Sequence, residues 1–231
     1  MNILINGGSR GLGKEVVKIL SENKKNIILV TGRNEDSLKA LSEAGKYGNI
    51  IPFKLDISAF ESYENTFIDI VDRELKSIDI LINMAGLLIV KDFADFSSGD
   101  SLKIMQTNFL GPSALIRAVK PYLKKGSHII NISSMGAYQG SAKYKGLSYY
   151  SASKAALSCL SECLAVEFRE DGIIVNCLAL GSADTGMFRE AFPGYEAGVT
   201  AEEMAEFIAD FTVNGSRFFN GKVLPVALNN P

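Results

Sequence analysis

Short apolar runs alternate along this chain with longer segments in which apolar residues recur at helical spacing. The first unit is a run at 2–6 followed by a helical segment at 11–23, and the second pairs 26–31 with 34–44. Five further runs lie at 49–55, 78–83, 128–132, 173–178 and 222–227, and the helical segments among them end near 75, span 100–124 and 148–170, and begin after 200. Because each right-handed crossover places its helix against one side of a sheet, this alternation predicts an α/β fold with a doubly wound parallel sheet of about seven strands, flanked by helices.

We expect a single domain over residues 1–231. The chain is 47% hydrophobic, enough for one well-buried core, although its length alone also allows two smaller domains. No linker-like stretch or block of charge divides it. The segment around 183–199, rich in glycine and interrupted by Pro193, is equally consistent with a lid over a substrate and with an ordinary surface loop.

Charge, hydropathy and cysteine content argue against several classes of protein. Twenty-four basic and 26 acidic residues give a formal charge of −2, which offers no electrostatic footprint for nucleic acid or an anionic membrane surface. No apolar stretch approaches the roughly 18 residues that span a bilayer, and the first strand begins at Asn2, so we expect a soluble cytoplasmic protein without a signal peptide. Three cysteines without metal-ligand spacing and a single histidine, His128, argue against a metal site and a Ser-His-Asp triad.

The first strand leads directly into a glycine-rich turn that opens the first helix. The turn reads Asn6-Gly7-Gly8-Ser9-Arg10-Gly11-Leu12-Gly13. A pyrophosphate needs close approach to backbone N–H groups at a helix N-terminus, and glycines at 7, 11 and 13 remove side chains that would block it. Such a turn alone is a weak signal, but its place at the start of a βαβ unit favours a Rossmann-type dinucleotide site.

The residues at the end of the second strand indicate which dinucleotide binds. A carboxylate there would bind the ribose 2′-hydroxyl of NAD, but this chain has Gly32 followed by Arg33. Arg33 and Arg10 could both face a 2′-phosphate through charge-assisted hydrogen bonds, so NADP(H) is preferred over NAD(H), unless both are simply solvated surface arginines. Asp56, after the third strand, would be placed to bind the adenine amino group or to cap a helix.

Tyr150 and Lys154 lie four residues apart on a predicted helix and therefore project from one face. A phenol titrates near pH 10, and a nearby ammonium would shift its pKa towards neutrality, which makes the pair an acid/base candidate. This spacing occurs by chance on many helices. It gains weight because the neighbouring strands end in Asn83-Met84-Ala85-Gly86 and Asn131-Ile132-Ser133-Ser134, which bring small polar groups to the same edge.

Together these motifs resemble those of the single-domain short-chain dehydrogenase/reductase family, in the family's order and over nearly the whole chain. The resemblance implies an NADP(H)-dependent oxidoreductase acting on CH–OH groups, with Tyr150 as acid/base, Lys154 tuning it and binding ribose, and Ser134 holding the substrate oxygen. Asn108 would hold a water in the proton relay, and Thr185 would meet the nicotinamide carboxamide. The residues expected to bind the cofactor are Gly7, Ser9, Arg10, Gly11, Leu12, Gly13, Arg33, Asp56, Ile57, Asn83, Ala85, Gly86, Tyr150, Lys154, Gly181 and Thr185.

Four features depart from the pattern of that family. Asn6 replaces a threonine in the glycine-rich turn, and Lys143-Tyr144-Lys145 resembles an insertion between Ser134 and Tyr150. Leu180-Gly181 stands where Pro-Gly is usual, and the sequence after Gly221 lacks the usual acidic-Gly-Gly ending. The insertion is expected to narrow or extend the mouth of the substrate site.

The expected partner is a small carbonyl or alcohol substrate whose identity the sequence does not give. A 3-oxoacyl-carrier-protein reductase remains an alternative, with Lys143, Lys145 and Arg189 as a basic patch for an acidic carrier. The alternative from another class is a catalytically silent NADP(H)-binding protein that serves a protein partner. The resemblance also implies a homodimer or homotetramer, packed through the helices at 100–124 and 148–170.

Overall fold

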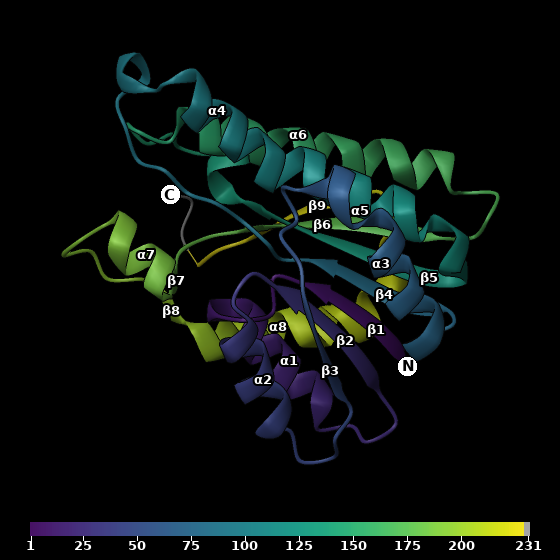
Figure 1. Cartoon of the computed structure of the whole chain (residues 1–231). Coiled ribbons are helices and arrows are strands. Elements are labelled where there is room, and N and C mark those ends of the chain that lie inside the picture. The colour runs from purple at the N-terminus through teal and green to yellow at the C-terminus, as the bar shows by residue number, and fades with distance from the viewer. Residues whose placement is uncertain (229–231) are drawn as a thin grey trace.

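The central element of the fold is a parallel sheet of seven strands in the order β3-β2-β1-β4-β5-β6-β9 (Figure 1). The structure is a computed structural model and describes residues 1–228, apart from the side chains of residues 62–65. The strands are β1 Asn2–Asn6, β2 Ile27–Gly32, β3 Ile50–Lys54, β4 Ile78–Asn83, β5 Leu123–Ser134, β6 Ile174–Leu180 and β9 Val223–Val226. The doubly wound α/β sheet predicted from the alternation of elements is confirmed.

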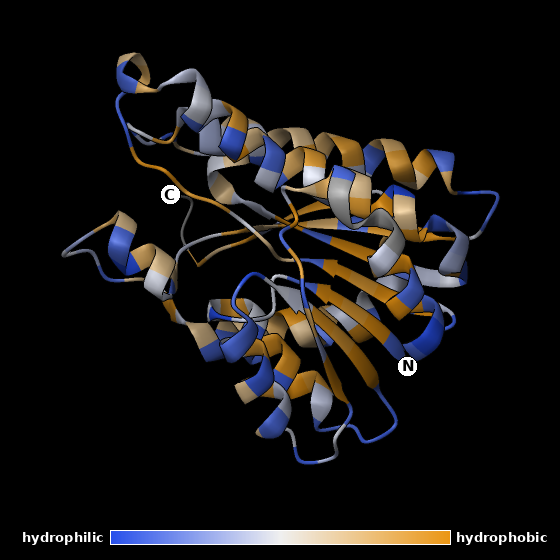
Figure 2. Cartoon of the chain, in the orientation of Figure 1, coloured by the Kyte–Doolittle hydropathy of each residue, from blue (hydrophilic) through white to orange (hydrophobic). Residues whose placement is uncertain are grey.

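Helices cover both faces of this sheet (Figure 1). One layer contains α1 Gly11–Ser21, α2 Glu35–Glu43 and α8 Ala201–Asn214. The other contains α3 Phe60–Glu74, α4 Ser98–Met105, α5 Gly111–Val119 and α6 Ser148–Glu167. Because the sheet lies between two helical layers, its strands are apolar along nearly their whole length, as Figure 2 shows.

Two hydrophobic cores result from the alternation of side chains along each strand. On β1, Ile3 and Ile5 are buried under α1 and α8, whereas Leu4 is buried on the other face under α3 and α5. This two-sided burial fixes the register of the strands. It therefore also fixes which residues stand at the carboxyl edge of the sheet.

The long helical segment predicted over 100–124 is found with slightly different ends. Helical residues run without interruption from Ser98 to Tyr122 through α4, a π-helical turn at Gln106–Leu110 and α5, and β5 begins at Leu123. Pro112 explains the π-helical turn, because it has no N–H to donate to the carbonyl of Asn108 four residues earlier, and the Gly111 N–H donates to the Gln106 oxygen instead.

The segment 183–199 is more ordered than its composition indicated. It contains β7 Ala183–Asp184 and the short helix α7 Gly186–Ala191, and β7 pairs in parallel with β8 Val199–Thr200. The segment lies beyond the carboxyl edge of the main sheet (Figure 1). The pairing of β7 with β8 thus holds the two ends of this segment together.

Candidate active site

Tyr150 stands in the first turn of α6 and Ser134 is the last residue of β5. The two hydroxyl groups share a side-chain hydrogen bond, and both residues are half-buried. Lys154, one turn further along α6, is only 3% exposed, and its Nζ donates to the backbone oxygen of Ile132 at 2.8 Å. The structure therefore brings these three predicted catalytic residues together at the carboxyl edge of the sheet. The fourth, Asn108, lies behind Lys154, since a Cβ on Gly86 would lie 3.4 Å from Lys154 Nζ and 3.9 Å from Asn108 Oδ1.

Burial controls the titration of both α6 groups. It raises the pKa of the Tyr150 phenol above its ordinary value, and the hydrogen bond with Ser134 opposes this only in part. Burial also lowers the pKa of Lys154 to about 8. The lowering of the tyrosine pKa expected from the i,i+4 spacing is therefore not found, because desolvation of the phenol outweighs the favourable interactions around it.

A column of serines attaches α6 to β5 behind these two residues. Ser158 Oγ donates to Ser133 Oγ at 2.8 Å, and both hydroxyls contact the backbone oxygen of Lys154 at 3.0 Å. One turn further on, Asn131 Nδ2 donates to Ser161 Oγ at 2.9 Å. These buried hydrogen bonds fix the rotation of α6 and so direct Tyr150 and Lys154 towards the edge of the sheet.

Asn108 is fully buried in the π-helical turn, and its side chain is committed to protein partners. Its Oδ1 accepts from the Leu87 N–H at 2.7 Å, and its Nδ2 donates to the Leu87 oxygen and to Ser153 Oγ, both at 2.9 Å. The water-holding role expected of Asn108 stays a prediction; its backbone carbonyl has no N–H donor four residues further on, because residue 112 is proline.

Glycines in the first turn permit its close packing on the end of β4. Gly7 has a φ of +92°, and a Cβ there would lie 2.4 Å from the backbone nitrogen of Ala85. A Cβ on Gly13 would lie 2.1 Å from the oxygen of Gly7. At Gly86, a Cβ would lie 3.4 Å from Lys154 Nζ, which shows how near the lysine is to this strand end.

The turn also satisfies the chemical needs of a dinucleotide phosphate. The N-terminus of α1, with Leu12 in its first turn, has no side-chain cap and no acidic residue, so its first N–H groups remain available to an anion. The space above Gly11 is open, because the nearest atom to a Cβ there, in Thr185, is 4.0 Å away. A recess of about 670 Å³ adjoins the turn and is lined in part by Ser9, Arg10, Gly11 and Thr185.

Arg10 and Arg33 are both exposed at this end, and among the described residues neither forms an ion pair. Gly32 is buried between them, and a Cβ added there would lie 2.7 Å from Ser9 Oγ and 2.9 Å from Ser9 Cβ. Ser9 thus occupies the space that a side chain at position 32 would need.

Four other predicted cofactor residues have structural contacts of their own. Asp56 Oδ1 accepts hydrogen bonds from Ser58 N at 3.0 Å and Ser58 Oγ at 2.7 Å within the turn before α3, whose N-cap is Ala59, so Asp56 does not cap that helix; an adenine contact stays a prediction. Ile57 is buried in the core, and Gly181 N donates to the Val226 oxygen at 2.8 Å. Thr185 caps α7 through the N–H of Phe188.

Asn83 lies inside the sheet rather than at a ribose site. It is 1% exposed, and its Nδ2 donates to Asn131 Oδ1 at 2.8 Å. A ribose contact by this side chain is therefore not supported. The backbone of the following residues, Ala85 and Gly86, remains at the strand end.

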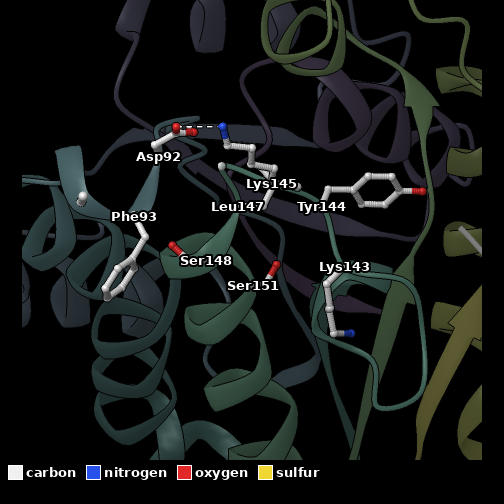
Figure 3. A pocket seen from close by; sticks show the side chains of 10 residues that line it. Asp92, Phe93, Lys143, Tyr144, Lys145, Leu147, Ser148 and Ser151 are labelled. Atoms are coloured by element: carbon white, nitrogen blue, oxygen red, sulfur yellow. Dashed lines mark ion pairs between the residues drawn. The ribbon is translucent and has the colours of Figure 1, made fainter.

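Sequence reasoning missed the aromatic residues at the mouth of the site. The Phe93 ring stacks on Tyr149 with centroids 5.7 Å apart, and Phe96 packs against the same tyrosine at 4.9 Å. Of these three, Phe93 lines a recess of about 630 Å³ next to the start of α6, shown in Figure 3. The only signal in the sequence was two phenylalanines in a strand-end loop, too common a pattern to single out.

Comparison with known proteins identifies the family of this chain. Its sequence matches the family model described as short chain dehydrogenase over residues 1–196. The chain belongs to the short-chain dehydrogenase family. It is therefore a member of a family of oxidoreductases that bind a nicotinamide cofactor and act on small molecules.

Individual relatives within the short-chain dehydrogenase family are distant. The chain is 31% identical to carbonyl reductase family member 4 of Danio rerio over 182 residues, which are 78% of this chain and 75% of the relative. It is 29% identical to a mouse 3-oxoacyl-[acyl-carrier-protein] reductase over 184 residues, 79% and 75% of the two chains. A crystal structure of a short chain dehydrogenase from Burkholderia cenocepacia in complex with NADP is similar with a TM-score of 0.85 at 25% identity, covering 97% of this chain and 95% of that one.

Two further findings concern residues 1–61 and 66–228. In this described part of the chain, no helix combines the length and apolar character needed to cross a membrane. Over the same residues, no three histidine, cysteine, aspartate or glutamate side chains gather into a cluster that could hold a metal ion.

Proposed function

We propose that this protein is an NADP(H)-dependent oxidoreductase that moves hydride between the nicotinamide and a carbonyl or alcohol substrate. The observation that carries the proposal is the placement of Tyr150, Ser134 and Lys154. The tyrosine shares a hydrogen bond with Ser134, and Lys154 Nζ lies beside Gly86 at the strand end next to the glycine-rich turn.

In the carbonyl-reducing direction, Ser134 and Tyr150 hold the substrate oxygen by hydrogen bonds. The bound nicotinamide supplies the hydride. Because burial raises its pKa, Tyr150 is a protonated phenol at neutral pH and can donate its proton to the oxygen as negative charge develops there. The Lys154 ammonium then stabilises the phenolate, and water held at the Asn108 carbonyl returns the proton.

The proposed preference for NADP(H) is supported by two guanidinium groups that have no carboxylate partner among the residues the structure describes. Arg10 and Arg33 stand on either side of the Ser9–Gly32 contact, where a 2′-phosphate would project from the ribose. The structurally similar Burkholderia enzyme in complex with NADP supports this preference.

We further propose that the segment 183–199 covers the bound substrate and that the whole chain acts as one domain. The proposed assembly is a homodimer or homotetramer. Leu102 on α4 and Val166 on α6 are exposed on the helices expected to pack there. Light scattering at several protein concentrations would measure the assembly directly.

The decisive experiment is Tyr150→Phe assayed for NADPH oxidation with a panel of ketones and aldehydes. Loss of the phenolic proton donor should lower kcat by roughly 10²-fold or more, while NADPH binding measured by fluorescence is retained. A variant that kept near-wild-type turnover would overturn the catalytic assignment. A wild-type protein that binds NADPH but reduces nothing in the panel would favour the silent binding protein.

A further inference from the structure

The recess next to α6 adjoins the catalytic residues through Ser151, which lies across Gly136 from Ser134. Its lining includes Ser148 and Ser151 of α6, and Ser151 follows Tyr150 in the sequence. A Cβ on Gly136 would lie 2.9 Å from Ser151 Oγ and 3.6 Å from Ser134 Oγ, so these two hydroxyls flank one glycine. A substrate whose carbonyl oxygen reaches Ser134 and Tyr150 can therefore extend its remaining atoms into this recess.

Two of the three cations proposed for an acidic carrier are paired with carboxylates, and the third, Lys143, is bonded to neutral oxygens. Lys145 pairs with Asp92 at 2.8 Å, the contact drawn as a dashed line in Figure 3, and Arg189 pairs with Asp184. Lys143 Nζ donates to the Tyr138 oxygen and to Ser141 Oγ, both at 2.7 Å.

The pairing of these cations with carboxylates weakens the attraction that the surface would have for an acidic acyl carrier. Lys143, Lys145 and Arg189 are the cations that would meet an acyl carrier, and two of them have a carboxylate beside them. Exposed pairs of this kind add little to stability, but each carboxylate cancels the local field of its cation. Burying a carboxylate or phosphate here without a new partner would be unfavourable.

The lining of the recess combines apolar side chains with charged and hydroxyl groups, and the aromatic rings of Phe93 and Tyr144 lie on opposite sides of it (Figure 3). Phe93 is 69% exposed and Tyr144 is 49% exposed, unusually large fractions for aromatic side chains, and Leu147 lies buried next to them. The polar side chains available are the hydroxyls of Ser148 and Ser151 and the paired charges at the rim. Exposed aromatic residues around a concave surface are typical of sites that bind apolar ligands.

The inserted loop that carries Tyr144 is held in place. The Lys91 N–H donates to the Gly146 oxygen at 3.2 Å, which joins this loop to the segment before Phe93. Gly146 has a φ of +86°, and a Cβ there would lie 2.9 Å from Val90 Cγ1, so the two loops pack closely. Tyr144 is thus presented from a braced loop, which reduces the entropy lost when a ligand packs on it.

We propose that the substrate is a free, uncharged carbonyl compound with an apolar, preferably aromatic, body that lies against Tyr144 and Phe93. This inference rests on the proposed function, since it places the carbonyl at Ser134 and Tyr150. It also distinguishes the chain from a carrier-protein reductase, the activity in the name of its mouse relative.

The test compares four compounds with NADPH: butan-2-one, 4-phenylbutan-2-one, its para-carboxylate, and an acetoacetyl acyl carrier protein. The phenyl ketone should have a kcat/KM at least about tenfold above both the carboxylate and the small ketone. Higher kcat/KM with the carrier-linked substrate or the carboxylate would overturn the inference while leaving the oxidoreductase proposal intact.

Variants locate the effect in the recess. Tyr144→Ala and Phe93→Ala should each lower the ratio of kcat/KM for the phenyl ketone to that for butan-2-one by roughly tenfold, mostly through KM. The matched control is Tyr47→Ala, a tyrosine of similar exposure, 41%, in the connection between α2 and β3, where the ratio should not change. Equal ratios in all variants would contradict the proposal.

A binding measurement separates the two proposals if no ketone is turned over. Saturation-transfer NMR of 4-phenylbutan-2-one with the NADPH-bound protein should show contact through the phenyl ring in the wild type and a clear loss of it in Tyr144→Ala. Absence of turnover with such binding would remove the enzymatic proposal alone. Absence of binding would remove the recess proposal.

Discussion

The Nζ atom of Lys154 lies 2.8 Å from the backbone oxygen of Ile132, so the cation proposed to serve Tyr150 is anchored by strand β5. The amine is almost completely removed from solvent, and in the described part of the chain it faces no carboxylate that would offset the cost of its charge. Burial of the Lys154 ammonium therefore lowers the stability of the folded protein. This is how catalytic groups are commonly poised.

Lys154→Met should stabilise the fold at neutral pH while abolishing activity. The folded-state pKa of about 8 lies below the ordinary 10.5, so between these values the unfolded chain binds the extra proton and wild-type stability rises with pH. Below pH 8 the full penalty applies, at most roughly 3 kcal/mol, and the variant escapes it. Urea unfolding at pH 7 and pH 9.5 should show the variant more stable at pH 7 and the difference shrinking at pH 9.5. A constant difference would contradict the burial argument.

Ser158→Ala should impair catalysis by loosening α6 on β5. The substitution removes hydrogen bonds to Ser133 Oγ and to the Lys154 oxygen, which should cost about 1 kcal/mol of stability. If the serine column positions Tyr150 and Lys154, kcat should fall several-fold while the KM for NADPH changes little. Ser101→Ala, which removes a serine-to-backbone hydrogen bond on α4, is the control and should leave kcat unchanged. A stability loss without a kcat effect would limit Ser158 to a structural role.

The order of apolar runs and helical segments predicted the sheet, and the four-residue spacing predicted that Tyr150 and Lys154 share a helix face, because both features depend on local sequence. Burial on both faces makes strands such as β1 continuous apolar runs, and helical geometry alone aligns Tyr150 with Lys154. The π-helical turn before Pro112 was not predicted, because the apolar period continues through it and the proline changes only the hydrogen bonding of the preceding turn.

Other features depend on contacts that no local pattern contains. Asn83 turned out to bond Asn131 in a neighbouring strand, and Lys145 to bond Asp92 across the mouth. The direction of the Tyr150 pKa shift also depends on the tertiary structure, because the spacing of Tyr150 and Lys154 predicts that a cation is near but not that the phenol is desolvated.

Changing the cofactor preference from NADP(H) to NAD(H) should require two substitutions, one at the end of β2 and one in the glycine-rich turn that contacts it. Gly32→Asp alone would place its Cβ 2.7 Å from Ser9 Oγ, and the short serine side chain cannot move away without its backbone, so we expect a loss of about 1–3 kcal/mol and no gain with NADH. Ser9→Gly combined with Gly32→Asp should restore stability and raise kcat/KM with NADH.

Arg33→Ala should instead raise the KM for NADPH at least about tenfold and leave the KM for NADH unchanged. Arg217→Ala, an arginine that follows α8, is the control for Arg33.

The only histidine of the chain should make the fold sensitive to mild acid. His128 Nδ1 lies 3.3 Å from the Thr212 oxygen, and its Nε2 lies 3.0 Å from Asn176 Nδ2. The Asn176 amide cannot turn around to accept a proton from the ring, because its Nδ2 also donates to the Phe219 oxygen and its Oδ1 accepts from Lys222 N. Protonation would therefore set two donors against each other in a buried site, which agrees with the lowering of the His128 pKa by burial to about 4.

Since the folded pKa of His128 lies below the ordinary 6.5, the stability it contributes is complete above pH 6.5 and is lost as the pH falls towards 4. The slope of unfolding free energy against pH should reach up to about 1.4 kcal/mol per pH unit in that window. His128→Leu should be less stable at pH 7.5 by about 1–3 kcal/mol, because it leaves the Thr212 carbonyl unpaired, but should lack this slope. With one histidine in the chain, a single ring C–H resonance reports its pKa by NMR, and a resonance that titrates near 6.5 in the folded protein would refute the argument.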